Sequence, residues 1–154
     1  MSGDDGDWIP ILSGRAWMLG LDAPASLLGQ AAENVLTAVD PEFPKKARAD
    51  DILVAARFAD GSQGDATVRA LMDLGIGAVL ADAFDPAFEE SARRLGLRAA
   101  VVNEVLAIRT GDELRVDFEG SRISNRSTGD RYPIRNLDDQ ALADFRSSIA
   151  RADA

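Results

Sequence analysis

The chain has 154 residues, of which 46% are hydrophobic, enough for one compact domain with a sizeable core. It contains no cysteine and no histidine, so its own residues cannot form a disulfide, a thiolate metal site or a Ser-His-Asp triad. The net charge is −9, and the tightest basic group, Lys45, Lys46 and Arg48, is too sparse for a nucleic-acid-binding face. We therefore expect no nucleic-acid partner.

The N-terminal residues and the hydropathy of the chain bear on where in the cell the protein is found. No stretch of about 18 apolar residues is present, so no membrane partner is expected. Residues 1–7 are acidic and lack the features of a signal peptide. We expect residues 1–7 to be a disordered acidic tail, residues 8–154 to form a single domain, and the protein to be cytoplasmic.

The first third of the chain mixes short elements. Residues 8–21 combine apolar and aromatic side chains with glycines, which is typical of one or two short strands. Residues 26–39 have apolar side chains at helical spacing, with Ser26 as a possible cap. Residues 41–48 are expected to form a short helical turn.

The middle of the chain alternates apolar runs with helical segments. The runs cover 52–56, 78–81 and 99–102, and continuous apolar runs are typical of strands buried on both faces. Helices are expected at 66–74, which Gly75 ends, and at 86–95, with Asp85 as N-cap and Gly96 after the last turn. This order predicts a parallel α/β core.

The last third has a different pattern. Residues 106–118 alternate with period two around a turn at 110–112, and Gly120 and Gly129 mark two more turns. We expect antiparallel strands or hairpins here, followed by a final helix over 138–151.

A glycine-flanked serine lies where the first apolar run passes to the first helix. The loop is Gly61-Ser62-Gln63-Gly64-Asp65. A helix N-terminus offers free N–H groups and a partial positive charge, so this loop can bind an anion or stabilise a serine alkoxide. The alternative is that Ser62 or Asp65 caps the helix and the glycines only form a turn. The spacing matches neither a P-loop nor a dinucleotide fingerprint.

Several motifs appear together in one order. They are Gly14-Arg-Ala-Trp17, Pro41-Glu-Phe43, Asp51-Ile-Leu-Val-Ala55, Ala70-Leu-Met-Asp-Leu-Gly-Ile-Gly-Ala-Val-Leu-Ala81 and Gly111-Asp-Glu-Leu-Arg-Val-Asp117. In this order the chain resembles the small subunit of 3-isopropylmalate dehydratase, which is similar to the C-terminal swivel domain of aconitase. The resemblance covers about residues 14–139. It implies an α/β fold, a swivelling three-layer β/β/α domain with a short parallel sheet core and antiparallel strands in the C-terminal half.

The resemblance also assigns roles to the loop. The family has Gly-Ser-Ser-Arg-Glu-His-Ala where this chain has Gly61-Ser-Gln-Gly-Asp-Ala-Thr67. It implies that Ser62 is the catalytic base and that Gly61, Gln63, Gly64 and Asp65 contact the substrate. The family's arginine, which clamps a substrate carboxylate, is replaced by Gly64, and glycine cannot imitate that contact. Either the substrate lacks this carboxylate, another group binds it, or the family's chemistry is lost.

The resemblance further implies a division of labour between two chains. This chain is expected to hold no metal or other cofactor. A 4Fe–4S cluster is expected in an aconitase-type large subunit, and the two subunits are expected to form a heterodimer or heterotetramer that acts on a small hydroxy acid. Two other hypotheses stay open: a non-catalytic swivel module with a structural or regulatory role, and a stand-alone binder of a small anion.

Overall fold

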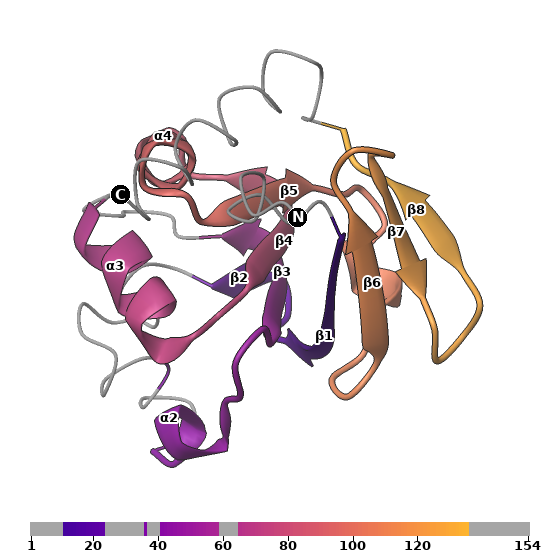
Figure 1. The fold of residues 1–154 in the computed structure, drawn as a ribbon, viewed down its shortest axis with the longest axis horizontal. Coiled ribbons are helices and arrows are strands. Elements are labelled where there is room, and N and C mark those ends of the chain that lie inside the picture. Colours follow the sequence, from indigo (N-terminus) through magenta and orange to yellow (C-terminus); the bar gives the residue numbers. More distant parts are fainter. Residues whose placement is uncertain (1–10, 24–35, 37–40, 59–64, 136–154) are drawn as a thin grey trace, which may run out of the picture.

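The computed structural model describes residues 11–23, 36, 41–58 and 65–135 (Figure 1). The elements are β1 Ile11–Met18, β2 Asp22–Ala23, α2 Phe43–Lys46, β3 Ile52–Phe58, α3 Asp65–Leu74, β4 Ala78–Phe84, α4 Pro86–Leu95, β5 Arg98–Val101, the 3₁₀ helix η3 Val105–Ala107, β6 Glu113–Asp117, β7 Arg122–Asn125 and β8 Arg131–Pro133. The expected acidic tail at 1–7 and the expected helix at 138–151 lie outside the described residues.

The strands form one curled mixed sheet in the order β5-β4-β3-β1-β6-β7-β8, with β2 beside β3. The strands β5, β4 and β3 and the end of β1 run parallel, whereas β1, β6, β7 and β8 pair antiparallel. Strand β1 belongs to both parts: Ala16–Met18 pair with β3, and Ile11–Arg15 pair with β6. The expected parallel core with antiparallel strands in the C-terminal half is therefore confirmed.

Alternate residues of the central strands enter two different cores. In β3, Leu53 and Ala55 join α3 and α4 in one apolar cluster, while Ile52 and Val54 join β6, β7 and β8 in the other. Figure 1 shows the resulting order of layers, with α3 and α4 on one face of the parallel strands and β6–β8 on the other. Because both faces are covered, β3 has no polar residue from Ile52 to Ala56, and the three-layer β/β/α expectation is confirmed.

Helix α4 begins and ends at the caps predicted from the sequence. The Asp85 carboxylate accepts hydrogen bonds from the N–H groups of Ala87 (2.9 Å) and Phe88, and Gly96 adopts a φ of 97° after the last turn of α4. The helix predicted over 66–74 is α3, which begins one residue earlier, and α2 lies within the predicted turn at 41–48. No helix in the described part of the chain is long and apolar enough to cross a membrane.

Three of the five sequence motifs meet around one buried carboxylate. Asp51 is 2% exposed, and its Oδ2 accepts hydrogen bonds from Arg15 Nη2 (3.0 Å), Trp17 Nε1 (2.8 Å) and the backbone N–H of Arg48 (2.9 Å). The Trp17 ring also meets Phe43 edge-on, with ring centroids 4.9 Å apart. This cluster joins β1, α2 and the start of β3, so these motifs serve the fold.

Two sequence expectations are wrong. Residues 106–109 form no strand, because η3 places Val105 and Ile108 in the core at a spacing of three and leaves Leu106 exposed. The turn at 110–112 docks on β1 instead, through Gly111 N–H to the Ala16 carbonyl (2.8 Å). Of the helix expected over 26–39 only Leu36 is described, and it is a buried turn residue with a φ of 56°, so the expectation fails at that residue.

Candidate functional site

Two hollows lie side by side at the carboxyl ends of the parallel strands β3 and β4. The aromatic hollow has a volume of about 260 Å³ and is lined by Arg57, Phe58, Ala83, Phe84, Asp85 and Pro86. The acidic hollow has a volume of about 600 Å³ and is lined by Leu21, Asp22, Ala56, Arg57, Asp82 and Ala83. The two hollows share Arg57 and Ala83, and this edge of a parallel sheet is where open α/β folds bind ligands.

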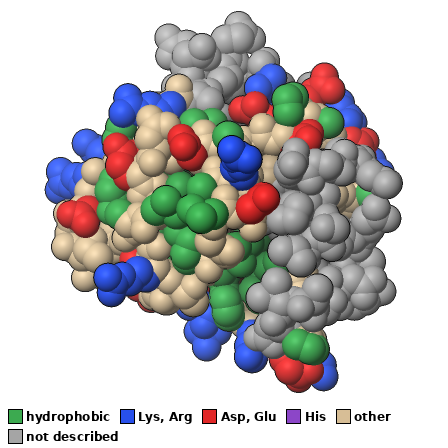
Figure 2. Space-filling model, turned by 180° about the vertical axis from the view of Figure 1, so that it is seen from behind, with side chains coloured by type: hydrophobic (Ala, Val, Ile, Leu, Met, Phe, Trp, Pro, Cys, Tyr) green, Lys and Arg blue, Asp and Glu red, His purple; other side chains and the backbone are tan. Residues whose placement is uncertain are grey.

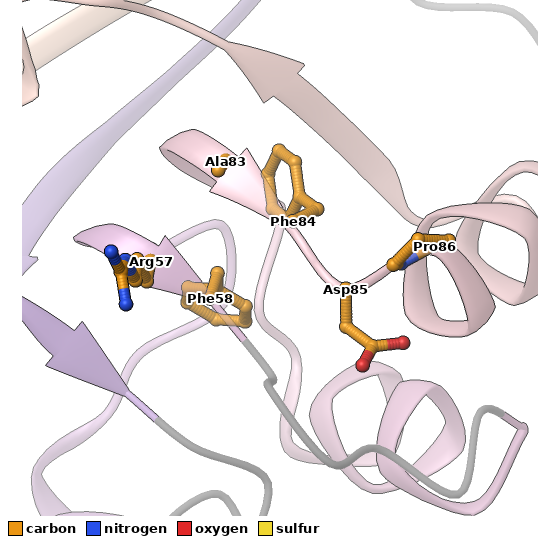
Figure 3. A pocket seen from close by; sticks show the side chains of 6 residues that line it. All are labelled: Arg57, Phe58, Ala83, Phe84, Asp85 and Pro86. Carbon is orange, nitrogen blue, oxygen red and sulfur yellow. The ribbon is translucent and has the colours of Figure 1, made fainter.

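The aromatic hollow has charged groups at its two ends (Figure 3). The Arg57 guanidinium and the Asp85 carboxylate lie on opposite sides of the rings of Phe58 and Phe84. These two rings are 5.7 Å apart between centroids, and both pack on Phe88 of α4, at 5.4 and 5.9 Å. Packing on Phe88 therefore holds the two rings that line the hollow, those of Phe58 and Phe84, against α4.

The two hollows together form one crevice, and two of its carboxylates, Asp85 and Asp82, accept hydrogen bonds from neighbouring groups. Asp85 Oδ1 serves as the N-cap of α4. Asp82 Oδ1 accepts a hydrogen bond of 2.8 Å from Asn103 Nδ2, which follows β5. Asp82 has a second carboxylate oxygen, so this edge of the sheet can accept a hydrogen bond from a ligand hydroxyl group.

Most of the loop predicted to form the site lies outside the described residues. This applies to Gly61, Ser62, Gln63 and Gly64, whose roles stay predictions. The described residues on either side are Phe58, at the end of β3 and in the aromatic hollow, and Asp65, the first residue of α3.

Asp65 is described, and its carboxylate links two helices. Oδ1 accepts hydrogen bonds from Ser91 Oγ (2.7 Å) and from the Arg94 guanidinium, both on α4. The Arg94 guanidinium, helped by the Ser91 hydroxyl, holds the pKa of the Asp65 carboxyl below its usual range. Asp65 therefore supports the packing of α3 on α4, and its predicted contact with substrate is not tested by these interactions.

Sequence reasoning missed the polar side chains that the crevice presents. Arg57 and Asp82 stand in or directly after the apolar runs that predicted β3 and β4. The signal was available, because polar residues at the carboxyl ends of parallel strands meet at one edge of the sheet. Strand register, which places Arg57 opposite Ala83 and beside Asp22, was needed to bring them together.

The donor set of this chain does not suit an iron–sulfur cluster. Such clusters are held mainly by cysteine thiolates, and the sequence has neither cysteine nor histidine. Within the described ranges, no three acidic side chains gather closely enough to hold a metal ion.

Comparison with known proteins gives consistent relatives. The chain is 35% identical to 3-isopropylmalate dehydratase small subunit 1 of Archaeoglobus fulgidus, over 82% of this chain and 86% of the relative. It is 32% identical to the isopropylmalate/citramalate isomerase small subunit of Methanocaldococcus jannaschii, over 92% and 89% of the two chains. The crystal structure of 3-isopropylmalate dehydratase from M. jannaschii shares the fold, with a TM-score of 0.78, 23% identity and coverage of 94% and 99%. No protein-family model matches the chain.

Proposed function

The chain belongs to the family of 3-isopropylmalate dehydratase small subunits, and we propose that it is the small subunit of an aconitase-superfamily hydro-lyase. Its reaction is the dehydration or isomerisation of a small hydroxy acid. The observation that carries this proposal is that the sequence similarity to a small subunit covers most of both chains, and that the fold is shared with a solved structure of the same family.

The proposal requires a second, larger subunit. The chain contributes no thiolate or imidazole, so a 4Fe–4S cluster belongs to the partner, where it supplies a Lewis acid for the departing hydroxyl. The two chains form a heterodimer or heterotetramer, and this chain is inactive alone. The proposal keeps the cytoplasmic location and the single domain over 8–154 predicted from the sequence.

Within this division, Ser62 acts as the base. Loss of water from a hydroxy acid requires removal of a proton from the carbon next to the carbinol carbon. Helix α3 begins at Asp65, three residues after Ser62. The partial positive charge of a helix N-terminus favours an alkoxide nearby, which is what a serine without a histidine partner needs. Gly61, Gln63, Gly64 and Asp65 complete the substrate contacts.

A second candidate follows from the replacement at Gly64. Without the arginine of the family, the chain could serve as a non-catalytic swivel partner that has lost its substrate site. The two candidates differ in what they require of Ser62, so variants of this residue separate them.

The test begins with partner capture. The tagged full chain, recovered from its own cells, should retain a larger protein with iron and the absorbance of an iron–sulfur cluster. The complex is then assayed with 3-isopropylmalate, citramalate and other hydroxy acids. Absence of any such partner would overturn the proposed function.

Ser62→Ala is the decisive variant. It should leave assembly and iron content unchanged and lower turnover by about 10²–10⁴-fold, the contribution of a general base. Ser13→Ala, which removes an exposed hydroxyl on β1, is the matched control and should retain full activity. Full activity in Ser62→Ala would refute the role of the serine. Gly64→Arg should favour diacids if the missing arginine sets the substrate range.

A further inference from the structure

Arg57 is held firmly at the centre of the carboxyl edge of the parallel sheet. It is the second-last residue of β3, and its backbone pairs with Asp22 of β2 on one side and with Ala83 of β4 on the other. Its N–H donates a 3.1 Å hydrogen bond to the Leu21 carbonyl. A side chain carried by an internal strand is positioned more accurately than one carried by a loop.

The Arg57 side chain has no partner within the described part of the chain. Arg57 is exposed, and no hydrogen bond or ion pair joins its guanidinium to a described residue. Arg15 and Arg94, in contrast, are engaged by Asp51 and Asp65. On the face shown in Figure 2, basic and acidic side chains are interspersed.

Among the described residues that line the two hollows, one is basic, Arg57. Three are acidic: Asp22, Asp82 and Asp85. A planar guanidinium binds a carboxylate through two parallel hydrogen bonds. The neighbouring carboxylates repel a second negative charge but accept hydrogen bonds from hydroxyl groups. The crevice therefore suits one carboxylate and at least one hydroxyl.

We propose that Arg57 binds the carboxylate of the substrate, and that this edge of the sheet takes a hydroxy acid through a single carboxylate. The guanidinium holds that carboxylate where the two hollows meet. The hydroxyl faces the acidic hollow, and an alkyl substituent lies in the aromatic hollow against Phe84 and Pro86. This inference rests on the proposed function for the reaction but not for the binding.

The binding test uses the full chain and three probes that carry one, two or no carboxylates. They are 2-hydroxyisovalerate with one carboxylate, 3-isopropylmalate with two carboxylates, and neutral 2-hydroxyisovaleramide. Titration calorimetry should detect the monoacid, give no tighter binding of the diacid, and detect little binding of the amide. No saturable binding of the monoacid, or clearly tighter binding of the diacid, would overturn the proposal.

Variants then assign the binding to the guanidinium. Arg57→Gln should raise the Kd of the monoacid by about tenfold or more, the scale of a charge-assisted pair. The Kd of Arg57→Lys should lie between those of wild type and Arg57→Gln, because lysine keeps the charge but cannot form two parallel hydrogen bonds to a carboxylate. Arg115→Gln, which removes an exposed arginine from β6, is the control and should leave the Kd unchanged. Equal Kd values for wild type and Arg57→Gln would overturn the assignment.

A kinetic readout in the assembled complex separates this inference from the proposed function. There Arg57→Gln should raise KM with little change in kcat, as expected for a contact made equally in the ground and transition states. Arg57-dependent binding without any catalytic partner would leave this inference standing while the proposed function fails. If turnover depends on Ser62 but the KM of Arg57→Gln is normal, the proposed function stands and the inference about Arg57 fails.

Discussion

Removal of the buried carboxylate of Asp51 should destabilise the protein strongly. Asp51→Ala leaves the indole N–H of Trp17 and the backbone N–H of Arg48 without their acceptor, at about 1–3 kcal/mol for each buried donor. Loss of one partner of a buried ion pair costs about 3–5 kcal/mol. The Arg15 side chain is 28% exposed and regains water, and the terms are not additive. We therefore expect the free energy of unfolding to fall by about 3–4 kcal/mol.

Two further variants calibrate this value. Asp51→Asn keeps one carbonyl oxygen as an acceptor and should cost less, about 1–2 kcal/mol. Asp73→Ala removes an exposed carboxylate from α3 and should change stability by no more than about 0.5 kcal/mol. Urea unfolding followed by circular dichroism gives the free energies, and the fluorescence of the two tryptophans provides a second probe. A loss below about 1 kcal/mol in Asp51→Ala would refute the reasoning.

Two other predictions concern the helices that flank the crevice. Asp85→Ala removes the N-cap of α4 and should cost about 1 kcal/mol, seen by calorimetry as a Tm lower by about 2–4 °C, whereas Asp85→Asn should retain most of the stability; equal Tm values would contradict this. Arg94 lowers the pKa of Asp65 in the folded state, so the stability this carboxylate contributes is present above its unfolded pKa and is lost as pH falls through the lower, folded pKa. The difference in urea midpoint between wild type and Asp65→Asn should therefore be present at neutral pH and vanish in strong acid, and a difference independent of pH would argue against the link.

The central part of the fold was predictable because its signals are local. The apolar run at 52–56 and the pair Asp85 and Gly96 each reflect a requirement met within a few residues: burial on both faces, or satisfaction of a helix end. The alternation at 106–118 correctly indicated β6 at Glu113–Asp117 but misled at 106–109, since Val105 and Ile108 are buried three residues apart in a 3₁₀ turn. A period-two pattern over so few residues does not distinguish a β-strand from a 3₁₀ turn.

The candidate site was predictable only in part, because it depends on contacts between distant residues. The glycine-flanked serine could be found from the chain alone, since its neighbours in sequence carry the signal. Arg57 could not, because its position beside Asp22 and opposite Ala83 follows from strand register. The motif residues Arg15 and Trp17 were noticed for their order in the chain, and only the structure shows that both donate to Asp51.

The sharing of β1 between the two parts of the sheet has a mechanical consequence. Its first residues set the register of the antiparallel strands, and its last residues set that of the parallel strands. A slip of one residue would turn Leu12 and Ala16 out of the core between the layers and misalign both sets of hydrogen bonds at once. The parallel and antiparallel parts of the sheet therefore cannot shear against each other without breaking β1, and any movement of this protein against a partner must carry both parts together.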